Sequence, residues 1–167
     1  REDLPGLIRH ATSLGIRSVL APCGMLVTED RLLELKDAGV TACSFSLDGP
    51  DRAAHDAFRG IDGAWDGVLG AMSVARGAGM PFQVNTVVRK GALDTLDAVY
   101  GKAMSEGATR LDLFFLVPTG RGRGIDALVP DDSEVKSAIE WSRGRRVKLT
   151  CCPQAGTCIG GRGFAFL

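Results

Sequence analysis

One recurring pattern most constrains how this chain folds. In this pattern, called a glycine joint below, a helix-like stretch ends at a glycine and a short apolar run follows. The joint occurs at Gly15, Gly39, Gly79 and Gly107. Glycine adopts at little cost the left-handed conformation that commonly ends a helix. The pattern therefore predicts helices that alternate with strands, and the strand runs cover residues 16–21, 40–47, 81–88, 110–117 and 147–151.

Strands that alternate with helices indicate parallel βαβ units. The strand runs are almost continuously apolar, as expected where helices cover a parallel sheet. The fold class is therefore α/β, and the spacing fits either a barrel or an open doubly wound sheet. In both architectures the functional residues lie beyond the carboxyl ends of the strands.

Polar side chains gather at those predicted strand ends, where they would suit a polar, partly charged small molecule. The alternative is that they only cap helices and form turns. The set comprises Ser46, Asp48, Asn85, Thr86, Thr119 and Arg121. Residues 120–124 alternate glycine with arginine, which indicates a loop that binds carboxylate or phosphate groups rather than a merely flexible surface loop.

Three other side chains in this region are interpreted as structural. His55 lies in the polar stretch 51–59 without a visible base or metal partner. Cys43 falls within a strand and is expected in the core. Cys23 follows a strand, where a buried thiol is more common than a reactive one.

The last part of the chain concentrates three of its five cysteines, at Cys151, Cys152 and Cys158. Thiolates so close together, followed by glycines, indicate zinc or iron–sulfur ligation. A site made only of cysteines usually needs four, so further ligands are expected beyond residue 167. A chance pair plus one free cysteine is the alternative.

Charge and hydropathy exclude some classes of function. Lys plus Arg and Asp plus Glu balance at 20 each, which disfavours nucleic acid as a partner. There is neither an apolar run near the length of a membrane span nor a signal-peptide pattern. The odd cysteine count argues against a disulfide framework, and we expect a cytoplasmic protein.

Several strings of residues resemble the radical S-adenosylmethionine (SAM) family, in the branch with a C-terminal SPASM auxiliary-cluster domain. Residues 1–4 look like the segment after that family's Gly-Gly-Glu-Pro strand end. Residues 46–50, followed by 55–60, form a distinctive string of these enzymes. The run 114–122, Phe-Phe-Leu-Val-Pro-Thr-Gly-Arg-Gly, closely resembles the haem-forming members, which include the siroheme-route haem synthase and the haem-d maturation protein.

The resemblance implies a partial (β/α) barrel over residues 1–146 and the start of a SPASM-like segment over 147–167. It implies SAM and a 4Fe–4S cluster, with an auxiliary 4Fe–4S cluster, as cofactors. The implied activity is that of an oxidoreductase. An electron from the cluster cleaves SAM, and the 5′-deoxyadenosyl radical abstracts a substrate hydrogen. The implied substrate is a tetrapyrrole of haem biosynthesis. A flavodoxin or ferredoxin would supply the electron.

Site residues are carried over from the family by matching motifs. The implied contacts to SAM come from the side chains of Ser46 and Arg59, with Asp48 and Asn85 at the same rim and the backbone of Leu116 and Val117 at the adenine. The implied contacts to substrate carboxylates come from Arg121 and Arg123. The implied auxiliary-cluster ligands are Cys151 and Cys158.

Two family motifs do not occur in the chain: the Cys-x-x-x-Cys-x-x-Cys loop that holds the SAM cluster, and the Gly-Gly-Glu motif. We therefore expect an internal piece of a longer enzyme, inactive alone. Three alternatives remain: a peptide-modifying radical SAM/SPASM maturase, a non-catalytic α/β anion-binding module, and a zinc-binding structural protein.

Overall fold

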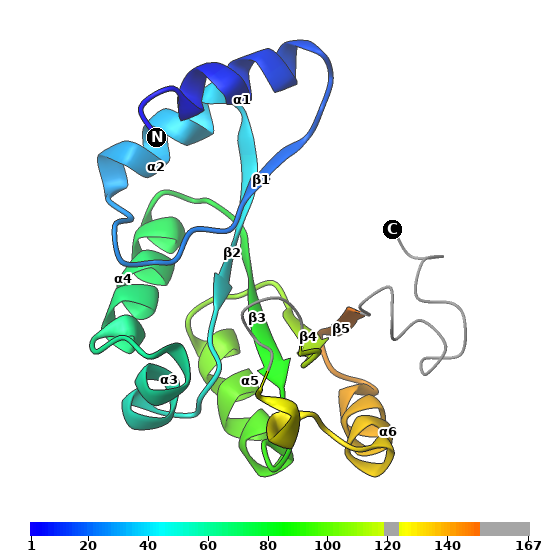
Figure 1. Ribbon diagram of the computed structural model, residues 1–167. Helices are drawn as coiled ribbons and strands as arrows, with labels where there is room; N and C mark the ends of the chain where they lie inside the picture. Colours follow the sequence, from blue (N-terminus) through cyan, green and yellow to red (C-terminus); the bar gives the residue numbers. More distant parts are fainter. Residues whose placement is uncertain (119–123, 151–167) are drawn as a thin grey trace.

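The computed structural model describes residues 1–118 and 124–150. At its centre is a parallel sheet of five strands that lie in the order of the sequence (Figure 1). The strands are β1 (Ser18–Leu20), β2 (Val40–Ser46), β3 (Phe82–Val88), β4 (Leu111–Phe115) and β5 (Val147–Thr150). All five fall inside the predicted runs.

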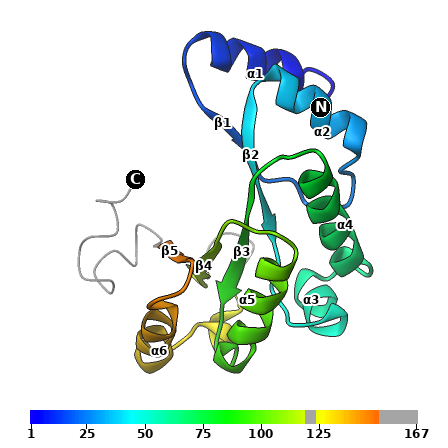
Figure 2. The ribbon, with the colours of Figure 1, turned by 180° about the vertical axis from the view of Figure 1, so that it is seen from behind.

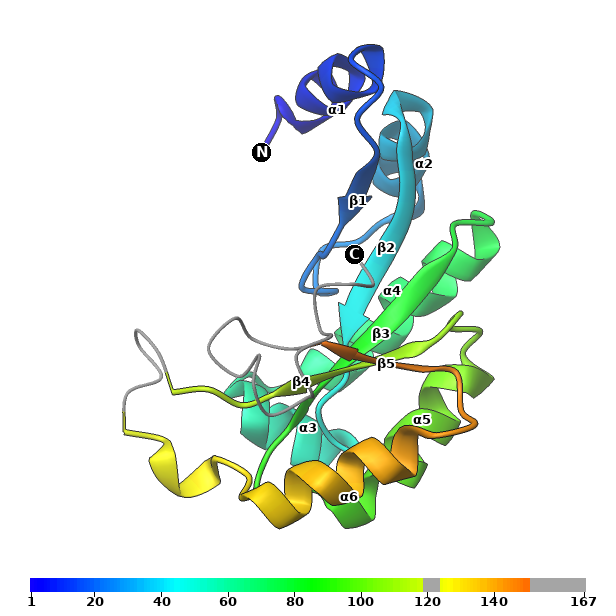
Figure 3. The ribbon, with the colours of Figure 1, turned by 90° about the vertical axis from the view of Figure 1, so that its right-hand side faces the viewer.

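Helices connect these strands. They are α1 (Leu4–Ser13), α2 (Glu29–Ala38), α3 (Arg52–Arg59), α4 (Ala64–Gly77), α5 (Leu96–Ser105) and α6 (Asp132–Ser142), with 3-10 turns η1 (Leu93–Thr95) and η3 (Asp126–Leu128). Figure 3 shows α2, α4, α5 and α6 along one side of the twisted sheet. Crossovers between parallel strands are nearly always right-handed, so strands added in one direction place their helices on the same face.

The sequential strand order decides between the two architectures left open by the sequence. A doubly wound sheet reverses its strand order and carries helices on both faces. Here β1 pairs with β2, β2 with β3, β3 with β4 and β4 with β5, all in parallel. The fold is therefore a partial (β/α) barrel.

The four predicted glycine joints are confirmed, because Gly15, Gly39, Gly79 and Gly107 all have positive φ angles. Gly39 shows why this residue type is needed. Its φ is 117°, and a Cβ there would lie 2.1 Å from Oγ1 of Thr12. Ending α2 at this point lets β2 begin at once, at Val40.

The core lies between the helices and the outer face of the sheet. Phe45, Val84 and Leu113 are fully buried on that face. The rings of Phe45 and Phe82 meet edge to face with centroids 5.5 Å apart. Burying one such side chain stabilises the fold by about 1.5–3 kcal/mol.

The inner face of the sheet is polar. This differs from the prediction of almost continuously apolar strands covered by helices. The register places Ser46 beside Asn85, Asn85 beside Asp112, and Asp112 beside Lys148. A hollow of about 510 Å³ opens on this face. Helices therefore cover the sheet on its outer face, and the inner face is the surface of a barrel interior.

Among the residues that the structure describes, no helix combines the length and the apolar character that crossing a bilayer requires.

Candidate functional site

The turn after β2 is held by backbone and side-chain hydrogen bonds to Asp48. The amide of Asp48 donates to Nδ1 of His55 at 3.0 Å. Oδ1 of Asp48 accepts from the amide of Val87 at 2.8 Å, and its carbonyl accepts from Nη1 of Arg89 at 3.0 Å. These bonds fix the carboxyl end of β2 against the carboxyl end of β3. In barrels of this kind, functional residues lie at these strand ends.

Helix α3 follows this turn; the sequence marked residues 51–59 only as a polar stretch, and no helix was predicted there. Asp51 caps the helix by accepting from the amide of Ala54 at 2.9 Å, and Gly60 ends it with φ 66°. In Figures 1 and 2, α3 lies below the end of β2. Two local signals were available in the sequence: an aspartate after a proline, and a glycine eight residues beyond the first helical position.

The position of α3 depends on Gly49. A Cβ at this residue would lie 2.5 Å from the amide nitrogen of His55 and 2.8 Å from the carbonyl carbon of Ala54. Both are backbone atoms that cannot move aside. The glycine therefore lets the helix pack directly on the strand end, and this brings Arg59, the last residue of α3, to the rim.

Arg59 and Asp48 form an ion pair in which the two partners differ in exposure. Nη2 of Arg59 lies 2.5 Å from Oδ2 of Asp48, and the side chains are 36% and 1% exposed respectively. This contact engages one end of the guanidinium, which carries further N–H donors. The negative charge of Asp48 thus holds Arg59 in place while the other donors of the guanidinium remain for another group.

A cavity of about 270 Å³ opens beside this pair. Its lining residues are Ser46, Asp48, Arg59, Asn85, Thr86, Val87 and Phe114. The structure thus brings together four residues expected at a SAM site. The cavity offers a hydroxyl, an amide and a guanidinium, groups that suit hydroxyl and carboxylate oxygens of a ligand. Its volume is just below the range of roughly 300–1,000 Å³ for whole small-molecule pockets, so it fits one portion of a nucleoside-sized molecule.

His55 and Asp56 fasten α3 to its surroundings, and the structural role expected for His55 is confirmed. Burial lowers the pKa of His55, which keeps its Nδ1 able to accept the Asp48 amide. The ring packs edge to face on Trp65 with centroids 6.0 Å apart. Asp56 accepts from the amides of Gly63 and Trp65 at 2.8 and 2.7 Å and so holds the start of α4.

Other expected site residues lie elsewhere. Leu116 and Val117 follow the end of β4 and do not line the cavity; the amide of Leu116 donates to the carbonyl of Val88 at 3.1 Å. The remaining four, Arg121, Arg123, Cys151 and Cys158, lie outside the described residues. Within residues 1–118 and 124–150, no group of three metal-ligating side chains occurs.

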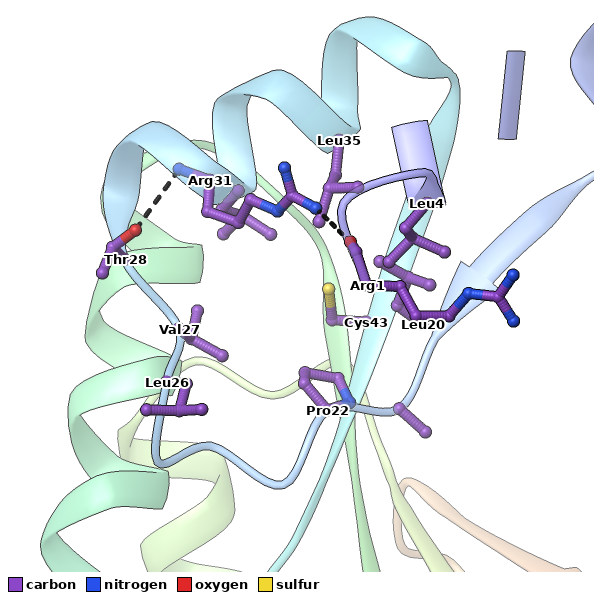
Figure 4. A pocket seen from close by; sticks show the side chains of 12 residues that line it. Arg1, Leu4, Leu20, Pro22, Leu26, Val27, Thr28, Arg31, Leu35 and Cys43 are labelled. Atoms are coloured by element: carbon purple, nitrogen blue, oxygen red, sulfur yellow. Dashed lines mark hydrogen bonds between the residues drawn. The ribbon is translucent and has the colours of Figure 1, made fainter. Parts of the chain in front are cut away.

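A separate hollow of about 380 Å³ lies between the start of the chain, β1 and α2 (Figure 4). Leucines and a proline make up much of its lining, and the Cys43 sulfur is next to it in Figure 4. Cys43 is buried as expected, and burial raises the pKa of its thiol. Cys23 is exposed, so the expectation of a buried strand-end thiol is wrong. The β1 strand ends at Leu20, and the loop that follows carries Cys23 away from the core.

Sequence reasoning did not select a polar network that reaches the cavity across the inner face. Gln83 contacts Asn85, Arg110 and Asp112. Asp112 is only 2% exposed. The signal was an acid, Asp112, inside the apolar run 111–115, where an unpaired charge would be costly to bury.

The model of the family described as the radical SAM superfamily matches residues 1–96. This chain belongs to the radical SAM superfamily. Its matched region contains Ser46, Asp48, Arg59 and Asn85, which line the cavity at the ends of β2 and β3.

Individual relatives agree with this membership. The chain is 36% identical over 159 residues to an AdoMet-dependent heme synthase from Nitratidesulfovibrio vulgaris, covering 92% of this chain and 43% of the relative. It is 32% identical over 155 residues to a PqqA peptide cyclase from Streptomyces rochei, covering 92% of this chain and 42% of the relative. The chain thus spans less than half the length of these two relatives.

Among solved structures, Streptococcus suis SuiB bound to precursor peptide SuiA superposes with a TM-score of 0.70, at 12% identity. The match covers 92% of this chain and 36% of SuiB. At this identity the likeness supports the fold alone. Radical SAM membership implies SAM and a 4Fe–4S cluster as the cofactors of the family. The hydroxyl, amide and guanidinium around the cavity fit the polar part of SAM.

Proposed function

We propose that this chain supplies the SAM-binding part of a radical SAM oxidoreductase that acts in haem or tetrapyrrole biosynthesis. The observation that carries the proposal is the cavity in which Ser46, Arg59 and Asn85 converge beside the buried carboxylate of Asp48. When bound, the cofactors supply the one-electron cleavage of SAM that generates the hydrogen-abstracting radical.

The residues of this chain would bind and orient the cofactor. Arg59 would hold the SAM carboxylate through the guanidinium donors that its ion pair with Asp48 leaves free. Ser46 would contact the ribose. Asn85 would face the same part of the ligand, and the backbone of Leu116 and Val117 would meet the adenine.

Further roles in this proposal rest on the sequence. Arg121 and Arg123 would bind substrate carboxylates such as tetrapyrrole propionates, because arginine forms bidentate pairs with carboxylates. Cys151 and Cys158 would ligate an auxiliary 4Fe–4S cluster in a segment that begins at residue 147. A flavodoxin or ferredoxin would deliver electrons, and the cytoplasm would keep the thiols reduced.

The first test is the iron and acid-labile sulfide content of the anaerobically reconstituted full-length protein, together with its absorbance spectrum. We expect at least two clusters, and cleavage of SAM to 5′-deoxyadenosine on reduction. Absence of iron would refute the radical chemistry and favour an anion-binding module. Stoichiometric zinc without iron–sulfur absorbance would favour the structural zinc alternative.

The similarity to the PqqA peptide cyclase favours a second candidate substrate class, a peptide. The two candidates are separated by adding a propionate-bearing tetrapyrrole or a precursor peptide to the reduced enzyme. We expect the tetrapyrrole to be consumed with formation of 5′-deoxyadenosine. Consumption of the peptide alone would replace the tetrapyrrole assignment and leave the SAM site unchanged.

A further inference from the structure

Four side chains on the inner face of the sheet form a connected chain of hydrogen bonds. Arg110 donates from Nε to Oδ1 of Asp112 at 2.7 Å, and its Nη2 donates to Oε1 of Gln83. Nε2 of Gln83 donates to Oδ2 of Asp112 at 2.9 Å and to Oδ1 of Asn85 at 3.2 Å. The network thus begins at an ion pair and ends at a residue that lines the cavity.

The chemistry of the ion pair fixes which way round the amide of Gln83 lies. A guanidinium only donates hydrogen bonds, and a carboxylate only accepts them. The oxygen of the Gln83 amide must therefore face Arg110, and its nitrogen must face Asp112. The reverse orientation would set donor against donor and acceptor against acceptor, next to a carboxylate that is almost fully buried.

The same logic passes from Gln83 to Asn85. Because the Gln83 nitrogen donates, the side of Asn85 that it meets must be the oxygen. The Nδ2 group of Asn85 is then directed away from Gln83. Within the described part of the chain, it makes no hydrogen bond to another residue. Since Asn85 lines the cavity, this N–H group is available to a ligand there.

We propose that Arg110, Asp112 and Gln83 act as positioning residues that hold Asn85 as a hydrogen-bond donor toward the ligand in the cavity. This inference rests on the proposed function, which makes the ligand SAM. The group recognised by Asn85 is then an acceptor, a carboxylate or ribose oxygen of SAM. None of the three positioning residues lines this cavity.

The proposal predicts energetic coupling between Gln83 and Asn85. Gln83→Met keeps a side chain of similar length, leaves the pair of Arg110 and Asp112 in place, and removes the bond that orients Asn85. The measurement is the Kd for SAM, without reductant, of the cluster-reconstituted full-length protein and of its Gln83→Met, Asn85→Ala and double variants. One neutral hydrogen bond is worth about 1 kcal/mol, or about fivefold in Kd.

We expect Gln83→Met to weaken SAM binding about fivefold in the wild-type background and less than about twofold in the Asn85→Ala background. Equal losses in both backgrounds would show a merely structural role and overturn the inference. So would an unchanged Kd for Gln83→Met alone. If the wild-type protein itself fails to bind SAM, the proposed function fails first, and that outcome is distinct from the other two.

A matched control and a second variant keep this test independent of folding. Ser44, on β2, lies beside Gln83 of β3, so Ser44→Ala alters the same face of the sheet but lies outside the network. We expect this control to leave the Kd for SAM unchanged. Asp112→Asn disrupts the network at its origin and is run through the same cycle with Asn85→Ala. The thermal midpoint of each variant confirms that it is folded, and a coupling absent from either cycle contradicts the proposal.

Discussion

Nη2 of Arg59 lies 2.5 Å from Oδ2 of the buried Asp48 carboxylate, while the arginine side chain stays 36% exposed. The ion pair therefore positions the guanidinium and leaves its other N–H donors for a ligand. A partly exposed arginine held in this way is suited to form charge-assisted hydrogen bonds with a carboxylate that enters the cavity.

The first prediction concerns this pair. Asp48→Asn preserves a side-chain acceptor for the Val87 amide but removes the charge that orients Arg59. We expect SAM to bind about tenfold more weakly, since a hydrogen bond to a charged group contributes roughly 1.5 kcal/mol. Titration calorimetry on the full-length protein measures the change. The control is Asp66→Asn, which breaks the exposed pair with Arg52 and should change the Kd less than about twofold. Equal affinities for Asp48→Asn and wild type would refute this role.

The second prediction is a pH dependence of stability that comes from His55. Burial lowers the pKa of this histidine below its ordinary value of about 6.5, so the unfolded chain binds its proton more readily than the folded chain. The free energy of unfolding should therefore fall as the pH drops below about 6.5. The lowered pKa values of aspartates and glutamates affect the free energy of unfolding at lower pH.

Denaturant unfolding at several pH values between about 5 and 7.5 measures this dependence, over a range set by the ordinary histidine pKa. His55→Asn is the control, because its amide oxygen can accept from the Asp48 amide but does not titrate. We expect the variant to have a flatter profile. An identical slope in both proteins would assign the dependence to other groups.

The third prediction tests the close approach at Gly49. Gly49→Ala places a methyl group within 2.5 Å of a backbone nitrogen, so α3 must move. We expect a loss of about 3 kcal/mol in the free energy of unfolding, and weaker SAM binding because Arg59 moves with the helix. Gly70→Ala is the matched control. No atom lies within 4 Å of its added Cβ, and we expect it to stabilise α4 by about 0.5–1 kcal/mol. Similar stabilities for the two variants would contradict the packing described.

The fourth prediction separates two thiols by their surroundings. Iodoacetamide should modify Cys23 in the folded protein and spare Cys43, because Cys43 is buried and burial raises its pKa. Peptide mass mapping measures the modification, and denatured protein, in which both residues react, is the control. Rapid modification of Cys43 under native conditions would show that β2 opens readily.

The elements of the fold could be predicted from sequence because their signals are local. Glycines that end helices and apolar runs of strand length gave all five strands to within a few residues. Helix α3 was not predicted because it has only eight residues and only one buried side chain, that of His55. A short, polar helix lacks the apolar periodicity on which sequence reasoning depends.

The site was only partly predictable for a different reason. Ser46, Asp48 and Asn85 follow from the rule that function lies at strand ends, and Arg59 required the family motif. Their distances depend on the register of β2 against β3 and on the packing of α3, which no local pattern contains. The network around Asp112 joins residues 27 and 29 positions apart, so it emerges only once the strands are paired.

The sequential strand order has a consequence for how the cavity comes into existence. Every strand of the sheet is hydrogen-bonded to a strand that is its neighbour along the chain. All residues that line the cavity accordingly fall between Ser46 and Phe114. Pairings between chain neighbours close short loops and form early at low entropic cost. The strands and helices that line the ligand cavity can thus come together once β4 has paired with β3, before α6 and β5 have joined the sheet.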